Sequence, residues 1–265
     1  MKISIITVCF NSESTIHDTI QSVINQSYDD IEYIIIDGAS GDNTLNIINE
    51  FKGNISYLIS EPDEGLYYAM NKGIGLATGE IIGILNSDDL YFNKDTLQKV
   101  VSLFKSDDDV EVVYGDLIYV SSDDTNRVVR YWKSKPYYNS FFEDANVPPH
   151  PAFFVKKSLY DRIGLYNTVL KLASDYEFML RAMKANIVKS IYIPMVLVRM
   201  RLGGETNKSI INIIKGNGEI SIAWRVNGFS LPVLYWPKKT LNKISQYWIM
   251  DLKVLSLLRK IKVLK

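Results

Sequence analysis

The first hundred residues alternate short apolar runs with amphipathic segments. Runs of apolar, often β-branched residues predict buried strands, and apolar residues spaced three or four apart predict helices. The predicted strands cover 3–10, 31–36, 55–60 and 81–85, and the predicted helices cover 16–24, 42–51, 65–76 and 95–104. Because strands and helices alternate from the start, the sequence predicts an α/β fold with a Rossmann-like, mostly parallel central sheet flanked by helices.

The pattern changes beyond residue 107. Predicted strands at 110–120, 127–132 and 152–155 favour an antiparallel or mixed extension of the sheet. A helix at 175–184 and strands at 187–193 and 195–199 complete the body. The remaining residues are rich in Lys and Arg, and they predict helices interrupted around Pro232 and Pro237.

The charges cancel over the whole chain but are unevenly distributed. Thirty basic and thirty acidic residues give no bulk attraction for nucleic acid, so nucleic acid is not an expected partner. Residues 199–265 carry 13 Lys and Arg against 3 Asp and Glu, whereas residues 1–198 carry 17 against 27. The sequence therefore predicts an acidic body with a basic tail.

The cysteine count and the apolar runs favour a cytoplasmic protein. The single cysteine, Cys9, cannot form an internal disulfide, and its place in an apolar run predicts a buried, inert thiol. The run Ile3–Phe10 is too short for a signal peptide or a spanning helix, and no longer apolar stretch follows.

Carboxylates follow several of the predicted strands. Asp37, Asp63, Asp88 and Asp89 come at or after strand ends, and parallel strands bring their carboxyl ends to the edge where ligands bind. Hard cations such as Mg²⁺ or Mn²⁺ take one or two carboxylates together with phosphate oxygens. Turn or helix-cap roles explain the same residues equally well.

Other cofactor chemistry lacks its motifs. The turn 11–14 after the first strand has no glycine to approach a dinucleotide, and the chain has no Walker A motif. Two histidines and one buried cysteine cannot supply a zinc site of nitrogen and sulfur ligands.

Six segments in order, 7–11, 36–44, 61–66, 69–74, 77–80 and 85–89, together resemble family 2 glycosyltransferases of the GT-A fold. The resemblance covers about residues 1–205 and is nearest to bacterial enzymes that build O-antigen, capsule or exopolysaccharide. It implies a GT-A domain at 1–205, with a nucleotide-sugar-binding half at 1–106 and an acceptor-binding half at 107–205. The sequence predicts that residues 206–265 form a basic, helical C-terminal extension.

The resemblance also implies a reaction. An inverting enzyme would move a hexose from a nucleoside-diphosphate sugar, UDP-linked, to a hydroxyl of a polyprenyl-diphosphate-linked saccharide at the cytoplasmic face of the inner membrane. A catalytically inactive nucleotide-sugar-binding subunit and a sugar nucleotidyltransferase remain alternatives. The nucleotidyltransferase should carry a Gly-rich basic loop after the first strand, which this chain lacks.

The resemblance assigns roles to individual residues. Asp175 is the expected catalytic base, although a helix N-cap is the alternative, and Asp88 is the expected ligand of Mn²⁺ or Mg²⁺, with Asp89 as second candidate. His150, Arg199 and Arg201 are candidates for the acceptor site or for a mobile loop over the diphosphate. The expected donor contacts are Thr7, Asn11, Asp37, Asp63, Asn71, Lys72, Asn86, Ser87 and Asp88.

Three positions depart from the family pattern. Asn86 replaces the first acid of the Asp-x-Asp motif, Ser174 replaces a Glu before the catalytic Asp, and Tyr68 stands where close relatives often have Asp. Asn86 and Ser174 are the observations that keep the inactive alternative open.

The basic tail predicts an interfacial amphipathic helix. Its lysines recur at seven-residue spacing beside an apolar stripe, which favours attachment to an anionic membrane surface, and packing on the body is the alternative. The lysines are Lys239, Lys253 and Lys260, and the stripe is Leu241, Ile244, Trp248, Leu252, Leu255 and Leu258.

Overall fold

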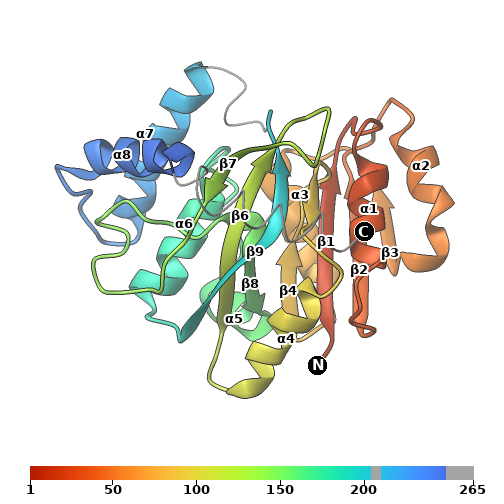
Figure 1. Ribbon diagram of the computed structural model, residues 1–265, viewed down its shortest axis with the longest axis horizontal. Coiled ribbons are helices and arrows are strands. Elements are labelled where there is room, and N and C mark those ends of the chain that lie inside the picture. Colours follow the sequence, from red (N-terminus) through yellow and green to blue (C-terminus); the bar gives the residue numbers. More distant parts are fainter. Residues whose placement is uncertain (204–209, 249–265) are drawn as a thin grey trace.

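The structure, a computed structural model, describes residues 1–203 and 210–248. Its centre is one mixed sheet with the strand order β3-β2-β1-β4-β8-β6-β9-β5, and β7 pairs with β6 outside this path (Figure 1). The strands are β1 (Ile3–Cys9), β2 (Ile31–Asp37), β3 (Tyr57–Ser60), β4 (Ile81–Ile84), β5 (Asp89–Tyr91), β6 (Val112–Val120), β7 (Val128–Trp132), β8 (Phe153–Lys156) and β9 (Ser190–Arg201).

The two halves of the sheet differ in direction, as the sequence predicts. β1 pairs in parallel with β2 and β4, and β2 pairs in parallel with β3. β8 then runs antiparallel to both β4 and β6, which makes the second half mixed. The predicted α/β class is confirmed. β1–β4 form the wholly parallel part, and in the mixed part β6 also pairs in parallel with β9.

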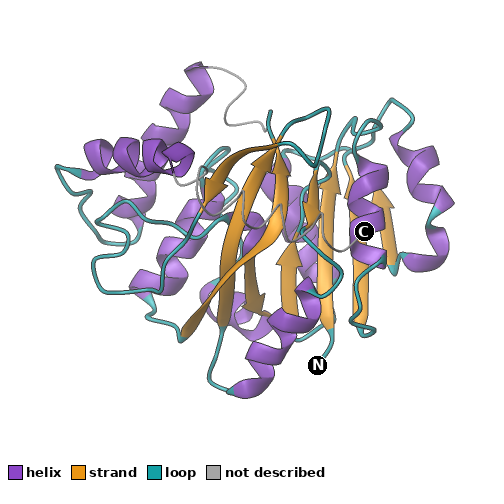
Figure 2. Ribbon diagram, viewed as in Figure 1, coloured by secondary structure: helices purple, strands orange, loops and turns teal. Residues whose placement is uncertain are grey.

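Helices cover both faces of this sheet (Figure 2). Alternate residues of β1 point to opposite faces, so Ile6 and Val8 join one hydrophobic cluster while Ile3 and Ile5 join the other. The first cluster is covered by α3 (Leu66–Leu76), α5 (Lys157–Ile163), α6 (Ser174–Leu180) and α7 (Ile210–Val226), and the second by α1 (Ile16–Ile24), α2 (Thr44–Glu50) and α4 (Thr96–Ser106).

Some predicted boundaries are wrong. The two strands expected at 187–193 and 195–199 form one strand, β9, whose pairing with β6 shifts register opposite Pro194. The irregularity accommodates a proline that cannot donate to the ladder. The helix expected to reach residue 184 ends at Leu180 and continues as a π-helical turn, Arg181–Ala185. β5 and α5 were not expected, because three to seven residues give little periodicity.

The described part of the C-terminal extension is helical and packs on the body. Trp224 of α7 donates to the Tyr176 hydroxyl at 2.8 Å, and the Tyr235 hydroxyl at the start of α8 (Tyr235–Trp248) donates to the same oxygen at 3.0 Å. Both side chains are almost completely buried in the cluster that contains α6. Within the described ranges, no helix combines the length and apolar character needed to cross a bilayer. Lys253, Lys260, Leu252, Leu255 and Leu258 lie outside the described residues.

The packing of α3 on the sheet yields a testable contrast between two glycines. A Cβ on Gly73 would lie 2.4 Å from Ile6 Cγ2, whereas a Cβ on Gly75 would meet nothing within 4 Å. We expect Gly73→Ala to lower the free energy of unfolding by about 1–3 kcal/mol through overpacking. Gly75→Ala should raise it by roughly 0.5–1 kcal/mol, because alanine is the better helix former.

Urea denaturation of the two variants measures both effects in the same helix. Equal midpoints for Gly73→Ala and the unsubstituted protein would show that α3 does not approach β1 this closely.

Candidate active site

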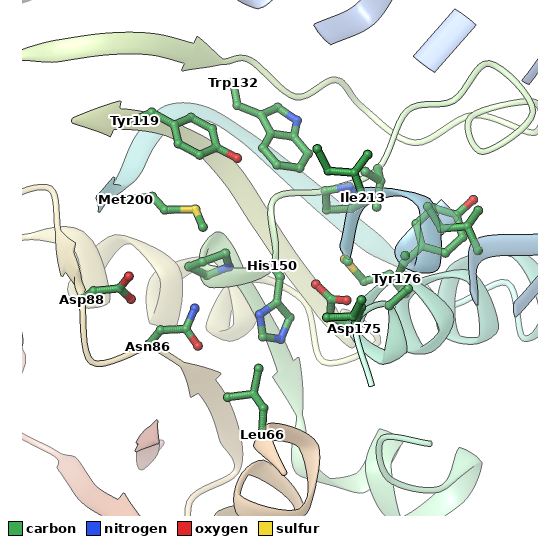
Figure 3. Close-up of a pocket in the computed structure, with 18 of the residues that line it drawn as sticks. Leu66, Asn86, Asp88, Tyr119, Trp132, His150, Asp175, Tyr176, Met200 and Ile213 are labelled. Carbon is green, nitrogen blue, oxygen red and sulfur yellow. The ribbon is translucent and has the colours of Figure 1, made fainter. Parts of the chain in front are cut away.

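A cavity of about 1510 Å³ opens at the edge of the sheet where β1, β2 and β4 end. A single small ligand usually occupies about 300–1,000 Å³, so this cavity has room for two substrates. Its walls come mainly from the turns after β1, β2 and β4, the segments 63–70, 130–135 and 145–179, and the helices α7 and α8. Figure 3 shows Asn86 and Asp88 on one side of His150 and Asp175 on the other.

One wall of the cavity consists of the loops that follow β1, β2 and β4, which side-chain hydrogen bonds hold together. Asn11 has a left-handed backbone (φ 48°) and accepts a hydrogen bond from the Gly41 amide at 2.9 Å. The backbone N–H of Asn11 donates to Ser40 Oγ at 2.9 Å. Ser12 Oγ lies 2.8 Å from Ser87 Oγ, which joins the loop after β1 to the loop after β4. Asn11 and Ser87 line the cavity as expected, and their loops are fixed before any ligand binds.

Asp37 lies beneath this wall instead of facing the cavity. Its side chain is completely buried and accepts hydrogen bonds from the Ser40 amide at 3.0 Å and the Ser60 hydroxyl at 2.6 Å. The expected direct contact between Asp37 and the nucleotide is not supported by this position. The carboxylate instead joins the ends of β2 and β3 to the loop that presents Asn11.

The remaining donor candidates divide in the same way. Asp63 lines the cavity and forms an ion pair with Lys72 at 2.6 Å, so Lys72 acts through Asp63 and not on the cavity wall. Asn71 exchanges two hydrogen bonds with the Tyr166 backbone, at 2.9 and 3.0 Å, and also lies off the wall. Thr7 is buried in β1, where its hydroxyl accepts a hydrogen bond from Tyr33 at 3.1 Å. Thr7 and Asn71 are therefore structural in this arrangement.

The turn between β4 and β5 carries the expected metal ligand. Asp88 faces the cavity, and Arg201 fixes its backbone by donating to the Asp88 carbonyl at 3.0 Å. Asn86 donates through Nδ2 to Asp89 at 3.1 Å, while its buried Oδ1 has no partner. Asp89 itself is completely buried in β5, and burial, followed by the charge of Asp88, raises the pKa of its carboxyl well above the usual value. Asp89 is thus badly placed as an alternative metal ligand.

The donor atoms at this turn suit a hard cation. The Asp88 carboxylate and the orphaned Asn86 amide oxygen are both oxygen ligands, which Mg²⁺ and Mn²⁺ prefer. No group of three or more His, Cys, Asp or Glu side chains in the described part of the chain could enclose an ion. An ion here would depend on phosphate oxygens and water for its other ligands, as Mg²⁺ commonly does.

Asp175 lies in the first turn of α6 and faces the cavity. The Tyr67 hydroxyl donates to its Oδ1 at 3.0 Å, and burial, reinforced by the Asp175 charge, keeps the pKa of Tyr67 well above its usual value. The phenol therefore stays protonated and fixes the carboxylate. The N-cap position belongs to Ala173, so the alternative that Asp175 serves as the helix cap is wrong.

The segment before α6 is held from α7. The Glu219 carboxylate accepts hydrogen bonds from the backbone amides of Lys171, Leu172 and Ala173 at 3.0, 2.7 and 2.9 Å. These bonds fix the segment that leads into α6, up to its N-cap residue Ala173. The position of Asp175 consequently depends on the C-terminal extension.

His150 lines the cavity between the two carboxylates. Its Nε2 lies 2.9 Å from the Tyr166 hydroxyl, and burial lowers the pKa of the imidazole below its ordinary value, which favours the neutral ring. A neutral imidazole can hydrogen-bond a sugar hydroxyl without adding charge beside Asp175.

The two arginines expected in a mobile loop lie instead in β9. Arg201 is buried, and its guanidinium bonds to Asp18 at 2.5 Å as well as to the Asp88 carbonyl. Arg199 lies over the Phe92 ring at 5.1 Å. Neither lines the cavity, so Arg201 positions the Asp88 turn from behind. The loop assignment failed because the apolar alternation of β9 extends farther than expected.

Sequence reasoning missed three residues. Tyr67, Met70 and Ile74 have helical spacing, which predicts that Tyr67 lies on the inward face of α3. The spacing does not indicate the hydrogen bond from Tyr67 to Asp175. No local signal identifies Glu219, whose partners lie far back in the chain. Lys239 of α8 was expected to face a membrane, but it lines the cavity.

Comparisons with known proteins agree with this fold and site. Residues 4–164 match the model of glycosyl transferase family 2. A PGL/p-HBAD biosynthesis glycosyltransferase of Mycobacterium bovis is 28% identical over 79% of this chain and 80% of its own length. An uncharacterised glycosyltransferase of Mycobacterium tuberculosis is 34% identical over 68% of each chain.

Two solved structures share the fold at low sequence identity. The mannosyltransferase PcManGT from Pyrobaculum calidifontis, in complex with GDP-Man and Mn²⁺, superposes with a TM-score of 0.64 at 17% identity, over 99% of this chain and 80% of that one. S. aureus TarS 1–349 in complex with UDP gives 0.63 at 18% identity, over 90% and 68%. The chain belongs to glycosyl transferase family 2 and has the GT-A fold, which confirms the resemblance seen in the sequence.

Proposed function

We propose that this glycosyltransferase moves a hexose, with inversion, from a UDP-linked sugar to a hydroxyl of a polyprenyl-diphosphate-linked saccharide for a bacterial surface polysaccharide. The observation that carries the proposal is that Asp88 and Asp175 line one cavity from opposite sides of His150 (Figure 3). An in-line displacement needs such a separation, because the leaving group and the attacking hydroxyl lie on opposite faces of the sugar.

The donor would bind against the wall formed by the loops after β1, β2 and β4. Asn11, Gly38 and Asp63 offer polar side-chain and backbone groups to a nucleoside. Asp88 and the Asn86 amide oxygen would hold Mn²⁺ or Mg²⁺ where the diphosphate ends. Such an ion would supply Lewis acidity that stabilises the charge developing on the departing diphosphate.

The acceptor hydroxyl would be deprotonated by Asp175. Tyr67 holds one carboxylate oxygen, and a carboxylate has about four lone-pair sites, so capacity remains for the acceptor proton. As the acceptor oxygen bonds to C1 of the sugar, its proton passes to Asp175 and the C1–diphosphate bond breaks with its electrons. His150 would orient a hydroxyl of either sugar between the two carboxylates.

The alternatives predict other products. An inactive subunit, suggested by Asn86 and Ser174, would bind the nucleotide sugar without hydrolysis or transfer. A nucleotidyltransferase would release pyrophosphate, whereas the proposed reaction releases UDP. A coupled assay for UDP, run with several nucleotide sugars, identifies the transferase. An assay for pyrophosphate, run with UTP and a sugar 1-phosphate, separates the nucleotidyltransferase from the inactive subunit.

We further propose that the outer face of α8 attaches the enzyme to an anionic membrane surface. Leu241 is 65% exposed and Ile244 is 49% exposed, while Val233 just before α8 is 94% exposed. The lysines contribute less than expected from the sequence, since Lys239 lines the cavity and Lys238 pairs with Asp144 at 2.7 Å. Lys243 is exposed but also lines the cavity, so the apolar side chains carry most of this proposal.

Asp175→Asn tests the base. We expect turnover to fall about 10²-fold or more, the usual worth of a positioned base. UDP affinity, measured by calorimetry, should not change, because Asn keeps the shape of the side chain and can still accept the Tyr67 hydrogen bond. Asp161→Asn, an exposed substitution on α5, is the matched control. Normal turnover in a folded Asp175→Asn protein would exclude Asp175 as the base.

Asp88→Ala tests the metal site. Activation by Mn²⁺ should disappear in this variant and persist in Asp89→Asn, because the Asp89 carboxyl is buried, has a raised pKa and resembles an amide in charge. Turnover titrated with Mn²⁺ gives the readout. Retained activation in Asp88→Ala, or its loss in Asp89→Asn alone, would reverse the assignment.

Leu241→Glu/Ile244→Glu tests the membrane face in the full-length chain. We expect less cosedimentation with anionic liposomes, because two carboxylates replace the apolar contacts and are repelled by the surface. High salt should reduce pelleting of the unsubstituted protein, since it screens the lysines. Tyr57→Glu, at the β3 edge of the sheet, serves as control. Undiminished pelleting of the double variant would rule out this face of α8.

A further inference from the structure

One part of the cavity wall is cationic. It comprises β7, the segment that follows it, and α8, and its cationic side chains are Arg130, Lys133, Lys135, Lys239 and Lys243. The carboxylates on the cavity wall, Asp63, Asp88 and Asp175, come from other elements. The mechanism proposed above uses none of these five cations.

Lys239 is turned into the cavity without a counter-charge. Its Nζ donates to the Asn217 side chain of α7 at 2.8 Å and lies over the Trp236 ring at 5.3 Å. In the described ranges it forms no ion pair with a carboxylate, whereas its neighbour Lys238 pairs with Asp144. Burial, followed by repulsion from Lys243, lowers the pKa of Lys239 to about 8, against a smaller raising effect from Asp175.

A second cation faces α8 from the sheet. Arg130 of β7 is only 6% exposed, and its guanidinium lies over the Tyr119 ring at 3.6 Å and 5.7 Å from the Tyr247 ring of α8. Its Nε is buried without a hydrogen-bond partner. An unsatisfied buried charged donor is costly unless a ligand satisfies it.

α8 packs on the body through Tyr235 and Trp236 in its first turn, but its following turns place cations and not apolar side chains toward the cavity. Leu241 and Ile244 point to solvent, while Lys239 points inward beside a second lysine of the same helix. Packing alone would favour the opposite arrangement, with apolar side chains inside and cations in water. The inward charges therefore indicate an anionic ligand.

We propose that Lys239 and Lys243, with Arg130 facing them, bind a phosphate or diphosphate group of the acceptor. This inference rests on the proposed glycosyltransferase function and extends it to the acceptor. Asn217 is on α7, as is Ile213, and Ile213 lies on the Asp175 side of His150, away from Asp88 (Figure 3). Lys239 therefore lies toward Asp175, whereas Arg130 stacks on Tyr119, which Figure 3 shows on the Asp88 side of His150. An anion held by the two lysines would place the attached saccharide beside Asp175.

Two variants and one control test the subsite in the full-length chain. Geranyl diphosphate, a short soluble prenyl diphosphate, is titrated by calorimetry in the presence of a chelator, so that no metal ion contributes. Lys239→Met and Lys243→Met should each weaken binding roughly tenfold, the effect of losing a charge-assisted contact. Lys238→Met removes the same charge from the same helix outside the cavity and should bind like the unsubstituted protein. Lys243 is exposed, so its substitution keeps the test valid if Lys239→Met does not fold.

A competition arm separates this subsite from the donor site. Protein saturated with UDP and Mn²⁺ should still bind geranyl diphosphate, and UDP affinity should be unchanged in both lysine variants. Unaltered geranyl diphosphate binding in both variants, or its displacement by UDP, would overturn the proposal. Failure of the proposed function has a different result, namely that the unsubstituted protein releases no UDP from any nucleotide sugar.

Two further ligands identify the source of the anion. Geraniol lacks the charge and should not bind. Inorganic pyrophosphate that binds more weakly than geranyl diphosphate would support a lipid-linked acceptor, and equal binding would support a soluble phosphate ester at the same lysines. Tight binding of geraniol would contradict recognition through the phosphate.

Discussion

The active site depends on the register of the parallel strands. Cys9 pairs with Asp37, and Asp37 pairs with Ser60, so β1, β2 and β3 end at one level and their following loops meet. Buried isoleucines on both faces hold this register, because a slip of one residue would exchange the side chains of the two faces. Asn11, Gly38 and Asp63 therefore reach one wall although the chain leaves the sheet and returns between them.

The position of Asp175 depends on α7 and α8, which follow it in the chain. Glu219 fixes three amides before α6, and Tyr176, next to Asp175, is the acceptor for both Trp224 and Tyr235. The residues that would take the acceptor's proton are thus anchored by α7 and α8. Although the extension lies beyond the region of family resemblance seen in the sequence, it supplies one wall of the cavity and the support of another.

The sequence predicted the alternating elements and the convergence of Asn11, Asp63, Asp88 and Asp175 on one cavity, because these features follow from periodicity and from motifs at strand ends. It could not predict which face of an element a polar side chain occupies. Asp37 and Asp89 belong to the same motifs but are buried. Ser60 of the neighbouring strand donates to Asp37, and Asn86 of the same turn donates to Asp89, and periodicity indicates neither bond. The sequence also did not predict which face of α8 Lys239 occupies. Its spacing from Lys253 and Lys260 fits a surface stripe, but contacts with Asn217 and Trp236 turn Lys239 toward the cavity.

The two sides of the cavity are built by different means. Loops that cross-link one another and a buried carboxylate hold the donor wall, so most substitutions there would disturb the sheet ends as well as the ligand. The opposite wall consists largely of side chains on α8, where Lys243 and Gln246 contribute to the cavity without belonging to the hydrophobic clusters. With the acceptor bound as proposed, substitutions on the cavity face of α8 would alter acceptor choice at little cost to folding, and this helix is where evolution or engineering would most readily change acceptor specificity while the sugar donor stays the same.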